Sequence, residues 1–246
     1  MYLLLSGEGV GDIGVCKLPA DRCERNDFSE GPMTLIIDQL IGIFLGYEMS
    51  HLETERVSYV SKAYLKSNKL PPMKKAMSLK GKKKPPETKY YFENARILAS
   101  IAKTKSIEVD DKVVAILFRD SDGTASAGRG DWVDKRNSMI QGFRAETFDL
   151  GVPMVPKPKS EGWLLCATKD NTYKDCEALE DESGNDDSGR ESLKDQLAAS
   201  LDGDINRDSL NKLIIEKVID IEKIDMSSFN IFKEDLQNAV GLAIKK

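Results

Sequence analysis

Acidic side chains follow two apolar segments of this sequence. Glu8, with Asp12 four residues further on, comes after residues 2–6, and the pair Asp120 and Asp122 comes just after VVAILF at 113–118. In open α/β sheets, ligands bind at the carboxyl ends of the strands. Hard cations such as Mg²⁺ prefer oxygen ligands and keep positions for water and substrate phosphate. The four carboxylates therefore predict a Mg²⁺ (or Mn²⁺) site of the kind that hydrolyses a phosphodiester.

The composition narrows the chemistry further. The 246 residues include a single histidine, His51, which excludes sites with two imidazoles, and its polar surroundings predict a surface position. The four cysteines, at positions 16, 23, 166 and 176, lack zinc-ligand spacing. We expect free thiols in a reducing cytoplasm. The N-terminus carries no basic segment and no apolar run long enough for a signal peptide, and no stretch approaches the roughly 18 apolar residues of a membrane span.

The net charge of −5 hides an uneven distribution. Residues 62–89 contain ten lysines and one acid, so this segment carries +9 and the rest of the chain −14. Such a segment is either a solvated surface loop or an arm that follows nucleic-acid phosphates by displacing counterions. In the second case, the contacts to nucleic acid are expected from Lys74, Lys75, Lys80, Lys82, Lys83, Lys84 and Arg119.

Apolar runs and turn residues predict the elements that position these side chains. Strands are expected at 2–6, 56–65, 113–118 and 152–156, and helices at 33–47, 90–104, 132–149 and 163–168. Strands separated by helices of this length indicate an α/β fold with a mainly parallel sheet flanked by helices. From 171 onward the sequence is acidic and mostly helical, with an amphipathic stretch at 209–224. We expect this part to form a helical extension packed on a core of residues 1–170.

Two known patterns compete for the carboxylates. Gly9, Gly11 and Gly14 spell the dinucleotide fingerprint, but the sequence that follows predicts no helix at the third glycine. Residues 120–124 (DSDGT) resemble the motif of haloacid-dehalogenase phosphatases, in which Asp120 would be the nucleophile, and Asp204 with Asp208 resembles the distal metal motif of that family. Against this resemblance, more than a hundred residues precede Asp120, although that family places its nucleophile on the first strand.

A third pattern agrees with more of the chain. A strand that ends in Glu8-Gly9, an acid at Asp12, a helix, further strand–helix units and a strand that ends in Asp120-x-Asp122 resemble the Toprim domain of primases, topoisomerases and OLD nucleases. The resemblance covers about residues 2–168, with the lysine-rich segment 62–89 as an insertion. The stretch from Lys157 and Lys159 through Glu161 into GWLL is similar to small bacterial Toprim-like proteins that accompany ATPases in phage-defence operons.

The Toprim resemblance implies a metal-dependent nuclease of DNA or RNA. Asp120 and Asp122 would hold one Mg²⁺, and Glu8 would complete that shell or act as general base on the attacking water. Asp12 or Glu161 would serve a second ion, and Lys159 would neutralise charge on the scissile phosphate. An ABC- or AAA-type ATPase partner in antiphage defence and a homo-oligomer are further implications. Whether Glu30, Lys157 or Lys159 joins the site stays open, as does a third class of function, a Toprim-like module that binds nucleic acid or a partner without cutting.

Overall fold

A five-stranded sheet forms the centre of the protein. The computed structural model describes residues 1–9, 11–47, 49–71, 86–121, 131–182 and 191–245. The strand order is β3-β5-β1-β6-β7; the last four strands are parallel, and β3 is antiparallel at one edge. The strands are β1 (Tyr2–Ser6), β3 (Arg22–Glu24), β5 (Val57–Val60), β6 (Val113–Phe118) and β7 (Gly151–Met154). The predicted α/β fold with a mainly parallel sheet is confirmed.

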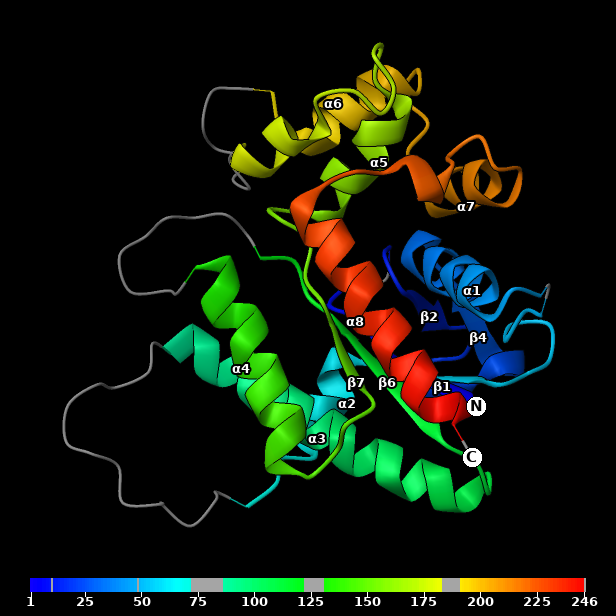
Figure 1. Ribbon diagram of the computed structural model, residues 1–246, viewed down its shortest axis with the longest axis vertical. Helices are drawn as coiled ribbons and strands as arrows, with labels where there is room; N and C mark the ends of the chain where they lie inside the picture. Colours follow the sequence, from blue (N-terminus) through cyan, green and yellow to red (C-terminus); the bar gives the residue numbers. More distant parts are fainter. Residues whose placement is uncertain (10, 48, 72–85, 122–130, 183–190, 246) are drawn as a thin grey trace.

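Helices cover both faces of this sheet (Figure 1). Helices α1 (Pro32–Leu45) and α8 (Ser227–Ile244) lie on one face, and α3 (Pro86–Glu108) and α4 (Trp132–Ala145) lie on the other. Along β6, Val114, Ile116 and Phe118 join the core on the first face, while the residues between them join the core on the second. Strands that are buried on both faces are apolar throughout rather than alternating, which is why VVAILF reads so clearly in the sequence.

A small antiparallel pair lies outside the main sheet. Strand β2 (Gly14–Cys16) pairs with β4 (Phe28–Glu30), and the carbonyl of Ile13 accepts hydrogen bonds from Gly31 N–H at 2.8 Å and from Thr34 Oγ1 at 2.6 Å. The chain therefore passes from Gly14 into a strand, and the third glycine of the dinucleotide pattern opens no helix. The prediction against a dinucleotide fingerprint is confirmed on this point.

The C-terminal helices belong to the core of the structure. Helix α5 (Ser160–Thr168) carries Trp163, which is fully buried with its ring 4.9 Å from Phe229 and 5.9 Å from Phe232 of α8. Its Nε1 donates to Ser228 Oγ at 2.9 Å. Because α8 also packs on β6 and β7, it forms one layer of the protein. Helices α6 (Leu193–Ser200) and α7 (Arg207–Ile215) pack against α5 and α1, respectively.

Two predicted elements end earlier than expected. The segment 56–65 is a strand only to Val60, because Ser61 Oγ accepts from Tyr64 N–H at 3.0 Å and caps a helix, α2 (Lys62–Ser67). The amphipathic stretch 209–224 is helical only to Ile215, and Val218 from the predicted apolar stripe is 58% exposed. Local side-chain capping in the first case and a chain reversal in the second override the apolar pattern.

The expectation of free cysteines is wrong. Cys16 is bonded to Cys23, and Cys166 is bonded to Cys176, with Cα atoms 5.8 and 5.3 Å apart, as disulfides require. The first bond connects β2 to β3, and the second connects α5 to the 3-10 turn Cys176–Asp181. The expectation of a cytoplasmic location thereby loses one of its supports.

The single histidine is buried, not at the surface as predicted. The side chain of His51 is inaccessible to solvent, and its Nδ1 lies 3.4 Å from Asp38 Oδ1 on α1. The same carboxylate oxygen accepts from the backbone N–H of His51 at 2.8 Å. The polar sequence around His51 therefore does not indicate exposure of the imidazole.

Within the described ranges, no helix has both the length and the apolar character needed to cross a bilayer.

The contact between α3 and α4 depends on the absence of a side chain at Gly142. A Cβ there would overlap the carbonyl oxygen of Phe92 and lie 2.8 Å from the Cβ of Ala95. We predict that Gly142→Ala lowers the free energy of unfolding by about 2 kcal/mol or more, since neither helix backbone can yield cheaply. Urea denaturation measures this change.

Gly241→Ala in α8 provides the matched control. Nothing lies within 4 Å of a Cβ at Gly241, so this variant should gain up to about 1 kcal/mol from helix propensity. Equal effects of the two substitutions would contradict the close approach of α3 and α4.

Candidate active site at the carboxyl ends of β1 and β6

The pairing of β1 with β6 brings the two acidic segments together. The strands are parallel neighbours, with Ser6 opposite Leu117, so the chain leaves both strands at the same edge of the sheet. Glu8 follows β1 by two residues, and Asp120 follows Phe118 by two residues. The prediction that these carboxylates come from neighbouring strand ends is confirmed.

The segments that follow β6 and β7 are joined by hydrogen bonds. Ser121 N–H donates to the carbonyl of Pro158 at 3.1 Å, and Ser121 Oγ donates to the same carbonyl at 3.2 Å. On the α3 side, Tyr91 Oη donates to the carbonyl of Asp120 at 2.9 Å. These contacts fix the backbone on both sides of Asp120, so its carboxylate is held at the strand end.

Ser160 connects the two acidic segments. Its Oγ donates to Asp12 Oδ1 at 2.6 Å, and its backbone N–H donates to Asp120 Oδ1 at 3.0 Å. Ser160 is 2% exposed and is the first residue of α5. The segments after β1, β6 and β7 therefore meet at one residue that the sequence patterns did not single out. A serine three residues before the predicted helix 163–168, just after the lysines of the Toprim pattern, was the signal available.

The turn that carries Asp12 is held from the other side by α1. Met33 N–H donates to the carbonyl of Asp12 at 3.0 Å, in the first turn of α1. A Cβ at Gly31 would overlap that carbonyl, so only glycine allows this approach. The Gly31-Pro32 start of α1 thus serves to place Asp12.

The carboxylates in this region are not fully neutralised. The pKa of the Asp12 carboxyl is raised to about 6, chiefly by burial; the Ser160 hydrogen bond lowers it, and the charges of Glu161 and Glu8 raise it. Glu161 Oε2 is buried and has no hydrogen-bond partner among the described residues. Buried carboxylates of like charge favour either a proton or a cation, and both Asp12 and Glu161 belong to the predicted metal set.

Glu8 faces the opposite side of the strand end, toward α2. Lys62 Nζ lies 2.6 Å from Glu8 Oε1. Burial lowers the pKa of Lys62, but the hydrogen bond and the charge of Glu8 outweigh it, so the net shift is upward. Lys62 was predicted only as part of the basic segment. Its position near Glu8 was not predicted, because the strand was expected to continue to residue 65. In the structure, β5 ends at Val60, beside the end of β1.

The predicted basic residues have different outcomes. Arg119 is fully buried, with Nη1 donating to the carbonyl of Phe118 at 2.6 Å and Nε to Tyr90 Oη at 3.2 Å, so the predicted contact of Arg119 with a nucleic-acid backbone is not available in this conformation. Lys159 is the half-buried N-cap residue of α5. Lys157 Nζ lies 3.4 Å from Asp181 Oδ1, so Lys157 pairs with an acid that is not one of the predicted site residues.

The remaining predicted residues lie away from these carboxylates or outside the described residues. Glu30 is paired with Arg25 at 3.1 Å on β4. Asp122 lies outside the described residues, and so do Lys74, Lys75, Lys80, Lys82, Lys83 and Lys84.

The donor set has the chemistry for Mg²⁺ or Mn²⁺ but does not form a finished cage. In the part of the chain that is described, no three His, Cys, Asp or Glu side chains are gathered as a metal-ligand group. Glu8, Asp12, Asp120 and Glu161 nevertheless supply carboxylate oxygens, the ligands that these cations prefer. Glu161 Oε2 is buried without a hydrogen-bond partner among the described residues, and a bound cation would supply one favourable contact to it. The residues therefore fit such an ion.

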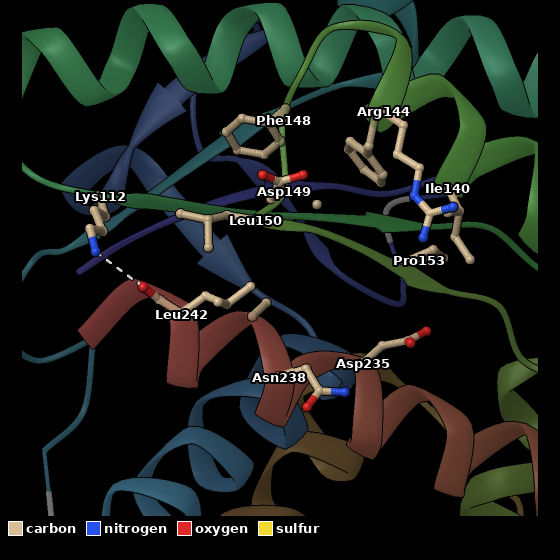
Figure 2. A pocket seen from close by; sticks show the side chains of 13 residues that line it. Lys112, Ile140, Arg144, Phe148, Asp149, Leu150, Pro153, Asp235, Asn238 and Leu242 are labelled. Atoms are coloured by element: carbon tan, nitrogen blue, oxygen red, sulfur yellow. Dashed lines mark hydrogen bonds between the residues drawn. The ribbon is translucent and has the colours of Figure 1, made fainter. Parts of the chain in front are cut away.

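A groove of about 600 Å³ lies at the other end of the sheet (Figure 2). It is formed by α4, β7 and α8, and its lining includes Phe148, Leu150, Asp235 and Lys112, whose Nζ donates to the carbonyl of Leu242 at 3.1 Å. Leu150 and Lys112 precede β7 and β6, so the groove opens at the amino ends of these strands. None of the predicted site residues lines it.

Comparison of the chain with protein-family models, with curated proteins and with solved structures finds no significant match.

The raised pKa of Asp12 predicts a pH-dependent effect on stability. The pKa is about 6 in the folded protein against 3.8 for the free group, so the folded state binds the proton more tightly. Burying the ionised form therefore costs stability above pH 6, and this cost fades as the pH falls toward 4. Without metal, Asp12→Asn should raise the free energy of unfolding by on the order of 2 kcal/mol at pH 7.5 and by about a third of that at pH 4.5.

Urea denaturation at the two pH values, in the presence of a chelator, measures this effect. Asp208→Asn is the matched control, since Asp208 has an 85% exposed side chain and should change little at either pH. A gain for Asp12→Asn that does not depend on pH would rule out the burial of an ionised Asp12.

Proposed function

We propose that this protein is a Mg²⁺- or Mn²⁺-dependent nuclease that hydrolyses phosphodiester bonds in DNA or RNA. The observation that carries the proposal is the double hydrogen bond of Ser160, which holds Asp12 and Asp120 together at the strand end that also delivers Glu8. Carboxylates that converge from neighbouring parallel strands suit a hard cation and a phosphate substrate.

The side chains have distinct parts in this proposal. Asp120, with Asp122, Asp12 and Glu161, would hold the ions. The bound ions would supply electrostatic stabilisation to the phosphodiester and to the attacking water. Glu8 is paired with Lys62, and its carboxylate can complete the ligand set or accept a proton from water. Lys159 sits at the start of α5 and keeps its predicted part beside the scissile phosphate.

The Toprim resemblance supports this assignment through the order of its motifs. A strand followed by Glu8 lies beside the strand followed by Asp120, and the helix that carries Glu161 follows the next strand in the sheet. The substrate-binding role of the lysine-rich segment, the cytoplasmic location, the homo-oligomer, and the ATPase partner in antiphage defence rest on composition or on this resemblance alone. They form part of the proposal as hypotheses.

The phosphatase alternative finds less support. Its distal motif would be Asp204, which lies between α6 and α7, and Asp208, which lies in the first turn of α7. Asp204 Oδ2 accepts from Ser209 Oγ at 2.6 Å, and its Oδ1 accepts from Asn206 Nδ2. Asp204 is therefore explained as a residue that holds the first turn of α7. A Toprim-like module that binds without cutting is the remaining alternative.

Substitution of the carboxylates distinguishes these functions. With Mg²⁺ or Mn²⁺, we predict that Glu8→Gln and Asp120→Asn each lower nuclease activity on DNA or RNA by at least about 100-fold, because each removes a ligand or the proton acceptor. Asp208→Asn should retain full activity. The measurement is the rate of oligonucleotide cleavage, with a small phosphomonoester assayed in parallel.

Each alternative predicts a different result. Hydrolysis of the phosphomonoester that survives Glu8→Gln but not Asp120→Asn or Asp208→Asn would indicate the phosphatase. Nucleic-acid binding without cleavage under every metal condition would indicate the binding module.

A further inference from the structure

Two basic side chains share one aromatic ring beside Glu8. Lys62 Nζ lies 5.6 Å from the centre of the Tyr90 ring, and the guanidinium carbon of Arg119 lies 5.8 Å from the same centre. Both distances are within the range of cation–π contacts. The ring therefore holds the lysine of α2 and the arginine that follows β6 in one cluster next to the predicted metal ligands.

Arg119 lacks an acidic partner in this cluster. It is fully buried, its Nη2 has no hydrogen-bond partner among the described residues, and it contacts a carbonyl, a phenol oxygen and the ring. A buried charge is costly unless it is paired. Glu8, which pairs with Lys62, brings a carboxylate into this cluster.

A divalent cation at Glu8 changes this balance. Lys62 Nζ and a metal ion compete for the same carboxylate, since the ammonium lies 2.6 Å from Glu8 Oε1. When the ion takes Glu8, Lys62 loses the carboxylate that it contacts in the described part of the chain. The Lys62 side chain is 45% exposed and has a flexible four-carbon stem, so it is free to turn to an anion that arrives from solvent.

We propose that Lys62 is a phosphate-binding residue, held by Glu8 in the metal-free protein and released to a non-bridging phosphate oxygen of nucleic acid when a divalent cation binds Glu8. This inference rests on the proposed function and deepens it. It assigns a phosphate contact beside Glu8 to Lys62, at the start of α2, in addition to the contact proposed for Lys159. Arg119 stays behind Tyr90 and adds positive potential without touching the substrate.

Two binding measurements on Lys62→Gln test the proposal without relying on cleavage. Calorimetry with Mn²⁺ alone should show tighter binding than in the wild type, by about three- to ten-fold, because the competing ammonium is gone. Fluorescence anisotropy with a labelled oligonucleotide in Ca²⁺, which permits binding without requiring turnover, should show affinity lowered by about ten-fold, as expected for one charged hydrogen bond. In a chelator the affinities of the variant and the wild type should be equal.

Two control variants separate this role from a general effect of charge. Lys66→Gln removes an exposed lysine from the same helix and should leave both affinities nearly unchanged. Lys62→Arg keeps a cation within reach and should restore most of the oligonucleotide affinity. A folded Lys62→Gln protein with wild-type affinity for Mn²⁺, or with wild-type affinity for the oligonucleotide in Ca²⁺, would overturn the proposal.

The outcomes also separate this inference from the proposed function. Unchanged affinities in a protein that cuts nucleic acid would remove Lys62 from the site and leave the nuclease intact. The predicted affinity changes in a protein that never cuts would keep Lys62 as a phosphate contact in a binding module. Absence of metal-dependent oligonucleotide binding in the wild type would overturn the inference directly.

Discussion

The candidate site depends on the two hydrogen bonds of Ser160. One reaches the carboxylate of Asp12 and the other the carboxylate of Asp120, so a single buried residue links the chain after β1 to the chain after β6. Each partner is supported by a different part of the fold: the α1 start fixes Asp12, and Tyr91 on α3 fixes Asp120. Helix α5 is itself held by the packing of Trp163 on α8. The C-terminal helix, although distant in sequence, thus helps to position the carboxylates.

Acidic and basic side chains lie on different sides of this strand end. On the side of α5, Asp12 and Glu161 are acids whose burial is not fully compensated, as the raised pKa of Asp12 shows. On the side of α2 and α3, Lys62 and Arg119 gather at Tyr90, and Lys62 pairs with Glu8. A site that holds a cation on one side and an anionic substrate on the other requires this separation. The overall net charge of −5 conceals it.

Features that depend on local sequence patterns could be predicted, whereas features that depend on contacts between distant segments could not. Strands β1 and β6 and the positions of Glu8 and Asp120 were predictable, because buried parallel strands are continuous apolar runs and ligands collect at strand ends. The Ser160 bridge was not, since it depends on where α5 docks and not on a local pattern. Lys62 was missed because the Ser61 cap ends a stretch that has strand-forming residues up to residue 65. The disulfides and the burial of His51 escaped because pairing and burial depend on which distant segments meet.

The proposed site requires that these carboxylates bind a divalent cation. Anomalous X-ray diffraction from crystals equilibrated with Mn²⁺ tests this binding, because the signal identifies the metal and its ligands together. We expect a Mn²⁺ peak within direct coordination distance of Asp120 and of at least one of Glu8, Asp12 and Glu161, with Lys62 moved away from Glu8 where that carboxylate is a ligand. A Mn²⁺-saturated crystal in which no peak lies near these side chains, and Lys62 stays on Glu8, would contradict it.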